Sequence, residues 1–310
     1  MKIANCSEER AVLAEKRIDM IDMHAHLACL EGGEGSCSAG KAGEYASAFL
    51  NEKQREAQGE LDLRESLGIT TCFSSGTPFQ WQVLESCQEH GSVLHSFGIH
   101  PWYAHQYDPG LYMEYFRQCD VVGEIGMDSV WCAVPLEIQR KSLECQLQIA
   151  ADLHRPVILH TKGQEAVIAR LLTDFPEKIC VHWYSGNERD LDAYLEKDCY
   201  FTLGPDTSAL CGLRGEGSTG KNGNGEQKEA VTVRQRMLRE IPSERLFVET
   251  DGIGAVAWAK GLEWLELLGI EPALWDGIVC AAAWKGISAQ KMSRKMEQNL
   301  MRFCGKRVFR

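Results

Sequence analysis

Five short apolar runs in this chain each end in histidines or an acidic residue, the side chains that commonly bind divalent cations. The runs are IDMHAH with His24 and His26, VVGEIGMD with Glu124, VILHT with His160, ICVHWYSG with His182, and LFVETDG with Asp251. When parallel strands close into a barrel, their C-terminal ends meet at one face. The pattern therefore predicts that four histidines and two carboxylates converge there and hold one or two divalent cations.

The order of strand-like and helical segments predicts an α/β fold, a single (β/α)8 barrel comprising residues 1–310. Apolar runs rich in Val and Ile indicate eight strands buried on both faces: Ile18–Leu27, Ile69–Ser75, Val93–His100, Val121–Asp128, Pro156–Thr161, Lys178–Ser185, Cys199–Gly204 and Arg245–Asp251. Helical patterns lie between most of them, at Gln80–Glu89, Pro135–Leu153, Gln164–Phe175 and Glu188–Glu196. Eight such units with polar residues at the strand ends favour a closed barrel over an open sheet.

Three further segments carry structural expectations. Glycine-rich stretches at residues 31–43 and 212–225 interrupt the alternation, and we expect both on the ligand-bearing face, either as surface loops or as a lid over the substrate. The stretch Gly252–Ile253–Gly254 does not open an obvious helix, so we expect none directly after Asp251. The segment Glu271–Arg310 is expected to be wholly helical.

Charge and cysteine content narrow the class of protein. The net charge of −11 disfavours extended contact with long duplex nucleic acid. Thirteen cysteines at irregular spacings, with no CxxC pair, indicate free thiols rather than disulfides. We see neither an apolar leader at the N-terminus nor a run long enough to cross a membrane. The chain is therefore expected to be cytoplasmic, and no obligate protein partner is indicated.

The spacing within the first and fourth strands suggests individual roles. Asp22, His24 and His26 alternate, which places them on one face of a strand. A metal bound by both imidazoles would satisfy them, with Asp22 orienting a ring or a water; the alternative is a polar strand edge facing solvent. Glu124 could bridge two cations with its two oxygens. Asp128, four residues on, would support the site or begin a helix.

The remaining candidates end the fifth, sixth and eighth strands. His160 and His182 follow consecutive strands, and imidazole with carboxylate ligands does not choose among Zn²⁺, Mg²⁺, Mn²⁺, Fe²⁺ and Ni²⁺. No cysteine lies near a ligand, which argues against a closed structural zinc site. Asp251 could bind metal and accept a proton from the attacking water, with Glu249 on the same strand face; otherwise Asp251 would be a helix cap.

Together these motifs resemble those of the TatD family of metal-dependent hydrolases, within the wider amidohydrolase-like barrels. The similar motifs are DMHAH, GIHP, GEIGMD, HTK, HWYSG and ETD, in that order. The resemblance implies a (β/α)8 barrel with a two-metal site. It implies that one metal is bound by His24, His26 and Asp251, the other by His160 and His182, and that Glu124 bridges them.

The resemblance also bears on the substrate. It implies that His100 of GIHP faces the substrate near the metals. Lys162 stands where the family usually has arginine, and Tyr184 where it usually has phenylalanine. Arginine grips a phosphate with a planar fork, whereas lysine is a point charge, so these departures affect the substrate rather than the metals.

The sequence therefore predicts hydrolysis of a phosphodiester by two-metal activation of water. Asp251 would accept the water's proton, while His100 and Lys162 would contact the phosphate oxygens. The expected substrate is single-stranded or terminal nucleic acid. Two alternatives stay open at this point. One is hydrolysis of amide or lactone bonds of a small molecule, although many such barrels carry a modified lysine where this chain has Glu124. The other is a non-catalytic metal-binding scaffold.

Overall fold

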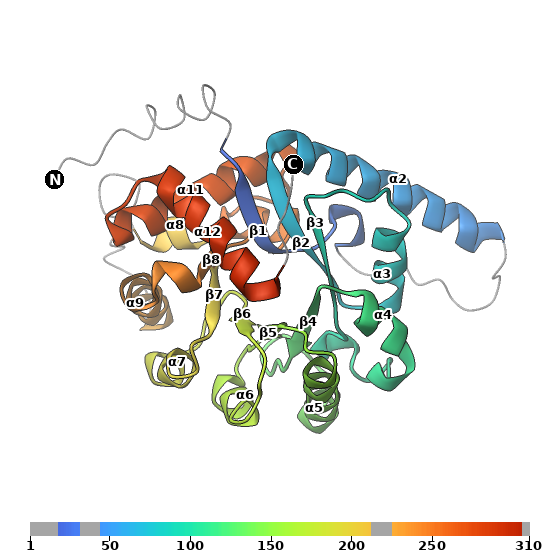
Figure 1. The fold of residues 1–310 in the computed structure, drawn as a ribbon, viewed down its shortest axis with the longest axis horizontal. Helices are drawn as coiled ribbons and strands as arrows, with labels where there is room; N and C mark the ends of the chain where they lie inside the picture. The colour runs from blue at the N-terminus through green and yellow to red at the C-terminus, as the bar shows by residue number, and fades with distance from the viewer. Residues whose placement is uncertain (1–17, 32–43, 212–224, 306–310) are drawn as a thin grey trace.

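The computed structural model describes residues 18–31, 44–211 and 225–305, and its centre is an eight-stranded parallel sheet. Each strand pairs with the next along the chain, so the sheet curls into a barrel (Figure 1). The strands are β1 (Met20–Ala25), β2 (Ile69–Ser75), β3 (Val93–Phe97), β4 (Val121–Gly126), β5 (Val157–His160), β6 (Ile179–Val181), β7 (Tyr200–Leu203) and β8 (Leu246–Val248). The Asp251 amide donates to the His24 carbonyl at 3.0 Å, which brings the chain after β8 against β1. The barrel is nearly closed, and the predicted fold class is confirmed.

Helices surround the strands on the outside of this sheet (Figure 1). They are α2 (Glu44–Leu67), α3 (Pro78–Glu85), α4 (Met113–Gln118), α5 (Leu136–Asp152), α6 (Glu165–Leu171), α7 (Glu188–Leu195), α8 (Thr207–Leu210), α9 (Gly225–Glu240), α10 (Ile253–Ala259), α11 (Ile270–Lys285) and α12 (Ala289–Cys304). Short 3-10 helices are η1 (Ala28–Leu30), η2 (Pro101–Tyr103), η3 (Pro109–Tyr112), η4 (Ser243–Arg245) and η5 (Leu267–Gly269). The four helices expected between strands are α3, α5, α6 and α7.

Helix α2 is the largest element that the sequence pattern missed. It has 24 residues and is rich in charge, so an apolar stripe is hard to see. Its inner face buries Ala57 and Leu61, but also the charged pair Glu60 and Arg64. The Arg64 Nε donates to Glu60 Oε1 at 2.9 Å, and the paired charges make this burial tolerable.

Two expectations about the last third of the chain are wrong. A helix, α10, does begin directly after Gly252, whose φ of +92° turns the chain sharply out of β8. The C-terminal segment is not wholly helical: α11 ends at Lys285, and Gly286 after it has the left-handed φ of +63°. Helix α12 then begins anew after Ser288, whose hydroxyl accepts a hydrogen bond from the Lys291 amide.

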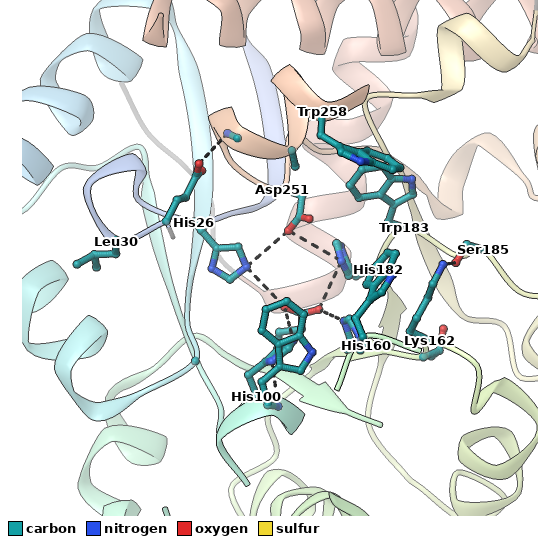
Figure 2. Close-up of a pocket in the computed structure, with 18 of the residues that line it drawn as sticks. His26, Leu30, His100, His160, Lys162, His182, Trp183, Ser185, Asp251 and Trp258 are labelled. Atoms are coloured by element: carbon teal, nitrogen blue, oxygen red, sulfur yellow. Dashed lines mark hydrogen bonds and ion pairs between the residues drawn. The ribbon is translucent and has the colours of Figure 1, made fainter. Parts of the chain in front are cut away.

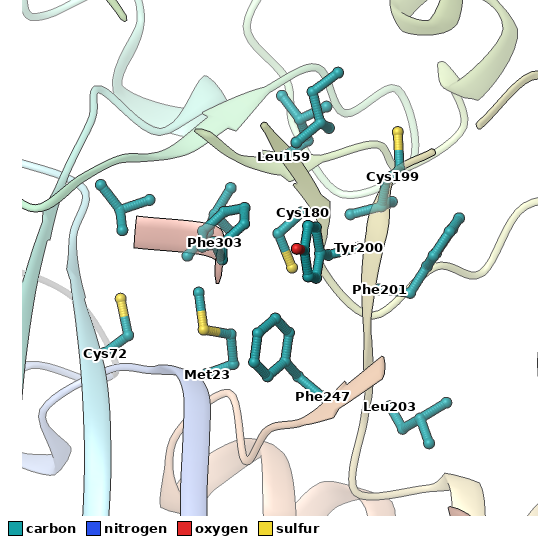
Figure 3. Packing of buried hydrophobic residues seen from close by; sticks show 14 of the residues in the cluster. Met23, Cys72, Leu159, Cys180, Cys199, Tyr200, Phe201, Leu203, Phe247 and Phe303 are labelled. Carbon is teal, nitrogen blue, oxygen red and sulfur yellow. The ribbon is translucent and has the colours of Figure 1, made fainter. Parts of the chain in front are cut away.

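Helix α12 covers the end of the barrel where the strands begin. Its Phe303 ring lies 5.2 Å from the ring of Tyr200, the first residue of β7, and 6.2 Å from that of Phe247 in β8 (Figure 3). Its buried Asn299 donates to the Ser243 and Leu246 carbonyls at 2.8 and 2.9 Å. This end of the barrel is therefore closed by apolar packing and satisfied hydrogen bonds.

Two other expectations concern whole segments. Most of the glycine-rich stretches 31–43 and 212–225 lies outside the described residues; Glu31 is described, and Gly225 begins α9. The expectation that no run is long enough to cross a membrane is wrong, because residues Leu267–Lys285 meet that length and apolarity. Core helices of soluble proteins meet them too, and half of this stretch is buried inside the molecule.

Candidate metal centre

The six predicted metal ligands come together at the C-terminal end of the strands. Figure 2 shows four of them, His26, His160, His182 and Asp251, around one cavity. His24 lies in β1 and His26 just after it, while Asp251 follows β8 by three residues. The His24 Nε2 atom is 3.4 Å from Glu124 Oε2 and 3.3 Å from Asp251 Oδ1. The His26 Nε2 atom is 3.6 and 3.5 Å from the same two oxygens. These four side chains form one compact set of ligand atoms.

The other carboxylate oxygen of Glu124 faces a second set. Glu124 Oε1 lies 2.6 Å from Nδ1 of His160, the last residue of β5, and 3.4 Å from Nε2 of His182, directly after β6. Glu124 is 2% exposed, so neither oxygen is turned to solvent. One carboxylate thus stands between two pairs of imidazoles, which is the arrangement needed to bridge two cations.

The chain beside Glu124 must come very close to β5 for this geometry. A Cβ atom on Gly126 would lie 1.8 Å from the carbonyl oxygen of His160. Only glycine fits such an approach. Gly126 thereby holds Glu124 and His160 at a distance where their side chains meet.

The donor set fits divalent cations. His24 is fully buried, and neither of its ring nitrogens has a hydrogen-bond partner within the described part of the chain. Buried polar atoms left without partners are costly, and a cation on Nε2 would remove that cost. Burial alone would lower the pKa of His24, but the Glu124 and Asp251 carboxylates outweigh it and raise that pKa well above 6.5. The pocket therefore attracts positive charge, whether carried by protons or by metal.

The two carboxylates of the set are ionised. Burial opposes the charge of Glu124, yet the surrounding imidazoles, His182 foremost, hold the pKa of Glu124 well below its usual value. For Asp251 burial is again outweighed, by His182 and His24, and the pKa of Asp251 is lowered. Ionised carboxylates are the form that binds metal.

Two acidic residues hold the outer nitrogens of the second pair of imidazoles. Asp128 Oδ2 lies 3.2 Å from His160 Nε2, and Glu249 Oε2 lies 2.9 Å from His182 Nδ1. Each contact fixes a ring so that its other nitrogen faces Glu124. Asp128 also accepts from the Val130 and Trp131 amides in the loop after β4, so of its two expected roles it supports the site and does not begin a helix.

Asp22 does not have the role that the sequence suggested. It is buried, but among the described residues its hydrogen bonds go to Arg64 and Thr250 rather than to an imidazole. The Arg64 Nη1 donates to Asp22 Oδ2 at 2.7 Å, and the Thr250 amide and hydroxyl donate at 2.8 and 2.6 Å. Asp22 therefore ties β1 to α2 and to the chain just before Asp251. Arg64 and Thr250 carry no local signal that would have revealed this contact.

His100 and Lys162 line the same cavity as the ligands. The His100 Nδ1 accepts from the Trp102 amide at 3.3 Å, and its Nε2 lies 3.6 Å from Glu124 Oε2. Burial lowers the pKa of His100 to about 3, so the ring is neutral and Nε2 carries the hydrogen. Lys162 donates to Ser185 Oγ at 2.9 Å, and burial lowers its pKa.

The cavity has a volume of about 680 Å³, and aromatic side chains line much of it. Its floor includes His26, Glu124, His160, His182 and Asp251. Indole rings of four tryptophans also line it: Trp102, Trp131, Trp183 and Trp258. The cavity therefore brings the candidate metal ligands and four indole rings together.

A family model described as TatD-related DNase matches residues 21–305. The chain belongs to the TatD-related DNase family. Membership confirms the resemblance found in the sequence motifs. It also confirms the predicted class of enzyme, a metal-dependent hydrolase of phosphodiester bonds.

Relatives with assigned names are distant. The human 3'-5' RNA nuclease TATDN2 is 27% identical over 241 residues, which is 74% of this chain but only 28% of that protein. The 3'-5' ssDNA/RNA exonuclease TatD of Pantoea vagans is 24% identical over 270 residues, 82% of this chain and 94% of that enzyme. The chain thus spans nearly all of one relative and under a third of the other.

Solved structures share the fold. The TatD homolog YJJV of Escherichia coli K12 has a TM-score of 0.62 at 16% identity, covering 93% of this chain and 98% of its own. The TatD family hydrolase of Entamoeba histolytica has a TM-score of 0.59 at 15% identity, with the same coverage. At such identities the likeness supports the barrel alone.

Proposed function

We propose that this protein is a two-metal exonuclease that hydrolyses phosphodiester bonds at the ends of single-stranded nucleic acid. The observation that carries the proposal is the position of Glu124, whose two oxygens each face a separate pair of imidazoles. Relatives named as ssDNA/RNA exonuclease and RNA nuclease support the substrate class. The net charge of −11 favours a short or single-stranded substrate over long duplex.

The assignment of ligands to two cations follows from their contacts: His24 and His26 face Oε2 of Glu124 and Oδ1 of Asp251, whereas His160 and His182 face Oε1 of Glu124. His24, His26 and Asp251 would hold one, and His160 and His182 the other, with Glu124 shared between them. Two divalent cations, when bound, would lower the pKa of a water and stabilise the charge of the displacement at phosphorus. Their identity is left open, since imidazole with carboxylate suits several metals.

Asp251 is the proton acceptor in this proposal. Both carboxylates line the cavity, but the Asp251 side chain is 23% exposed whereas that of Glu124 is 2% exposed. Asp251 is ionised, so it can take a proton from the attacking water. Its backbone has the left-handed φ of +57°, unusual for a residue other than glycine, which is consistent with a position fixed for function.

His100 and Lys162 would contact the substrate phosphate. The Nε2–H of His100 points toward Glu124 and can donate to a phosphate oxygen that binds beside this carboxylate. The ammonium group of Lys162 supplies a positive charge in the cavity. The predicted cytoplasmic location is consistent with such a substrate and stays a prediction.

The test is a substrate screen with a matched pair of variants. The protein is stripped with a chelator, reloaded separately with Zn²⁺, Mn²⁺ or Mg²⁺, and assayed on end-labelled single-stranded DNA, RNA, duplex DNA, amides and lactones. We expect cleavage of single strands that requires added metal. Cleavage of amides or lactones alone would refute the proposal.

The variants address the proton acceptor. Asp251→Asn keeps the shape and removes the base, so kcat should fall by about 10²–10⁴-fold. Asp174→Asn, at an exposed carboxylate outside the cavity, should leave kcat unchanged. Unaltered activity of Asp251→Asn would show that another group accepts the proton.

A further inference from the structure

Two indole rings form one corner of the cavity beside the metal centre (Figure 2). Trp183 directly follows the ligand His182, and the centroids of the two rings are 6.3 Å apart. Trp258, from α10, meets Trp183 with ring centroids 5.9 Å apart and planes at 70°. A pair at this angle offers the face of one indole and the edge of the other to whatever enters the corner.

Trp183 is held rigidly. Its Nε1 donates to Asp206 Oδ1 and its amide donates to Thr202 Oγ1, both at 2.9 Å. A Cβ atom on Gly204 would lie 2.4 Å from that Nε1, so only glycine leaves room for the indole. The backbone of Trp183 has a φ of +32°, which bulky residues rarely adopt. None of these contacts involves a metal ligand, so the metal centre does not account for them.

Trp258 is exposed where burial would be expected. It is 66% exposed although it lines a cavity, and its ring contact with Trp183 leaves most of the indole open. A large apolar face left open at the mouth of a binding site indicates a surface that a ligand covers. The indole face matches a planar heterocycle, and base-on-aromatic stacking is a frequent way of binding single strands.

Polar groups for a phosphate lie in the same cavity. Lys162 and Ser185 line it and contact each other at 2.9 Å. In Figure 2 the two indoles lie on the same side of the centre as this pair, and Leu30 lies on the opposite side. A nucleotide bound there would have its phosphate over the ligands and its base against the indoles.

We propose that Trp183 and Trp258 bind the base next to the scissile phosphate by stacking, and that they do so without selecting its identity. The inference rests on the proposed function and names the part of the substrate that this corner binds. The Nε1 donor of Trp183 is already used by Asp206, so this indole offers its ring rather than a hydrogen bond. Stacking alone tolerates every base, since each has an aromatic face.

The experiment pairs truncation of the protein with truncation of the substrate. Trp258→Ala and Trp258→Phe are assayed on a short single-stranded DNA and on the same strand with abasic residues at its two terminal positions at each end. Trp264→Ala is the matched control, because Trp264 is also exposed, at 70%, but does not line the cavity.

Trp258→Ala should lower kcat/KM on the normal strand by about 10–100-fold, mostly through KM. On the abasic strand it should change kcat/KM by less than about twofold, since there is no base to lose. Trp258→Phe should recover most of the loss, and Trp264→Ala should match the wild type. Equal losses on both strands, or equal cleavage of both strands by the wild type, would overturn the stacking role.

A binding measurement tests the stacking inference independently of whether the protein is a nuclease. Fluorescence anisotropy with Asp251→Asn compares labelled normal and abasic strands without turnover. Tighter binding of the normal strand, lost in the double variant with Trp258→Ala, supports stacking even if the wild type hydrolyses no phosphodiester. Equal binding of the two strands would overturn it even if the wild type is an active nuclease.

Discussion

The two ends of the barrel are built from the same strands but in opposite ways. Where the strands end, charged and polar groups crowd together: Glu124 is 2% exposed and faces imidazoles from several strands. Where the strands begin, α12 covers the barrel with the Phe303 ring and the paired amide of Asn299. The residues that pack the core and the residues that bind the metals therefore lie at opposite ends of the same strands. In β8 only three residues, Leu246–Val248, separate the two.

The separation follows from the physical demands of each end. Burying carboxylates and imidazoles costs free energy unless a cation is bound between them. The rest of the fold must therefore hold the ligand end in place. At the opposite end Phe303 packs closely against the rings of Tyr200 and Phe247, which need no counter-charge. Substitutions at one end should therefore change activity, and those at the other should change the free energy of unfolding.

The largest effect should come from Glu124→Ala. It removes the carboxylate that stands between both sets of ligands, and we expect kcat on single-stranded DNA to fall by at least about 10³-fold, because metal stabilisation of the transition state is worth several kcal/mol. Activity within tenfold of the wild type would contradict the bridging role.

At the other end the largest effect should come from Phe303→Ala. The side chain packs on Tyr200 and Phe247, and its loss should lower the free energy of unfolding by about 3–5 kcal/mol. Activity per folded molecule should stay within about twofold. Met301→Ala on the same helix, 40% exposed, is the control and should change stability by less than about 0.5 kcal/mol. A Phe303 variant that is stable but inactive would show that the ends are coupled.

The sequence predicted which side chains gather where the strands end, because the signal for that position is local. A polar residue at the end of an apolar run must lie at the end of a buried strand, and a barrel brings such ends together. His24, His26, Glu124, His160 and Asp251 could each be found that way. The same reasoning found His182, which directly follows the last residue of β6.

What the sequence did not show depends on contacts between distant residues. Asp22 lies two residues before His24, and only the fold reveals that its carboxylate accepts a hydrogen bond from Arg64, 42 residues away. Glu249 was placed on the right strand face, but its contact with His182 spans 67 residues. Helix α10 was missed because Gly252 looked like a loop residue, whereas its positive φ is what turns the chain into a helix.

Glu249 and Asp22 are both buried acidic residues near the ligands, but their substitution should change different quantities, and by less than the two changes above. Glu249→Gln weakens the support of the His182 ring and should reduce metal affinity or activity by about 10–100-fold. Asp22→Asn should instead lower the free energy of unfolding, since Arg64 loses its charged partner, and leave the metal affinity of the folded protein within about threefold. Competition with a chromogenic chelator measures the affinities. Equal losses of affinity in both variants would mean that buried charge in general, rather than contact with an imidazole, supports the metals.

The smallest effect, and the sharpest test of separation, is Asn299→Ala. Its amide donates to carbonyls on both sides of the start of β8, at Ser243 and Leu246, and the same segment leads to Asp251. Losing these bonds should lower the free energy of unfolding by about 1–2 kcal/mol in denaturant titration. Asn299→Asp should cost more, because a carboxylate would then face two carbonyl oxygens. If the ends are independent, kcat in both variants stays within about twofold of the wild type below the unfolding transition. A fall in kcat without a fall in the folded fraction would mean that a shift at the start of β8 displaces Asp251. Packing at one end of the barrel would then determine the geometry of the ligands at the other.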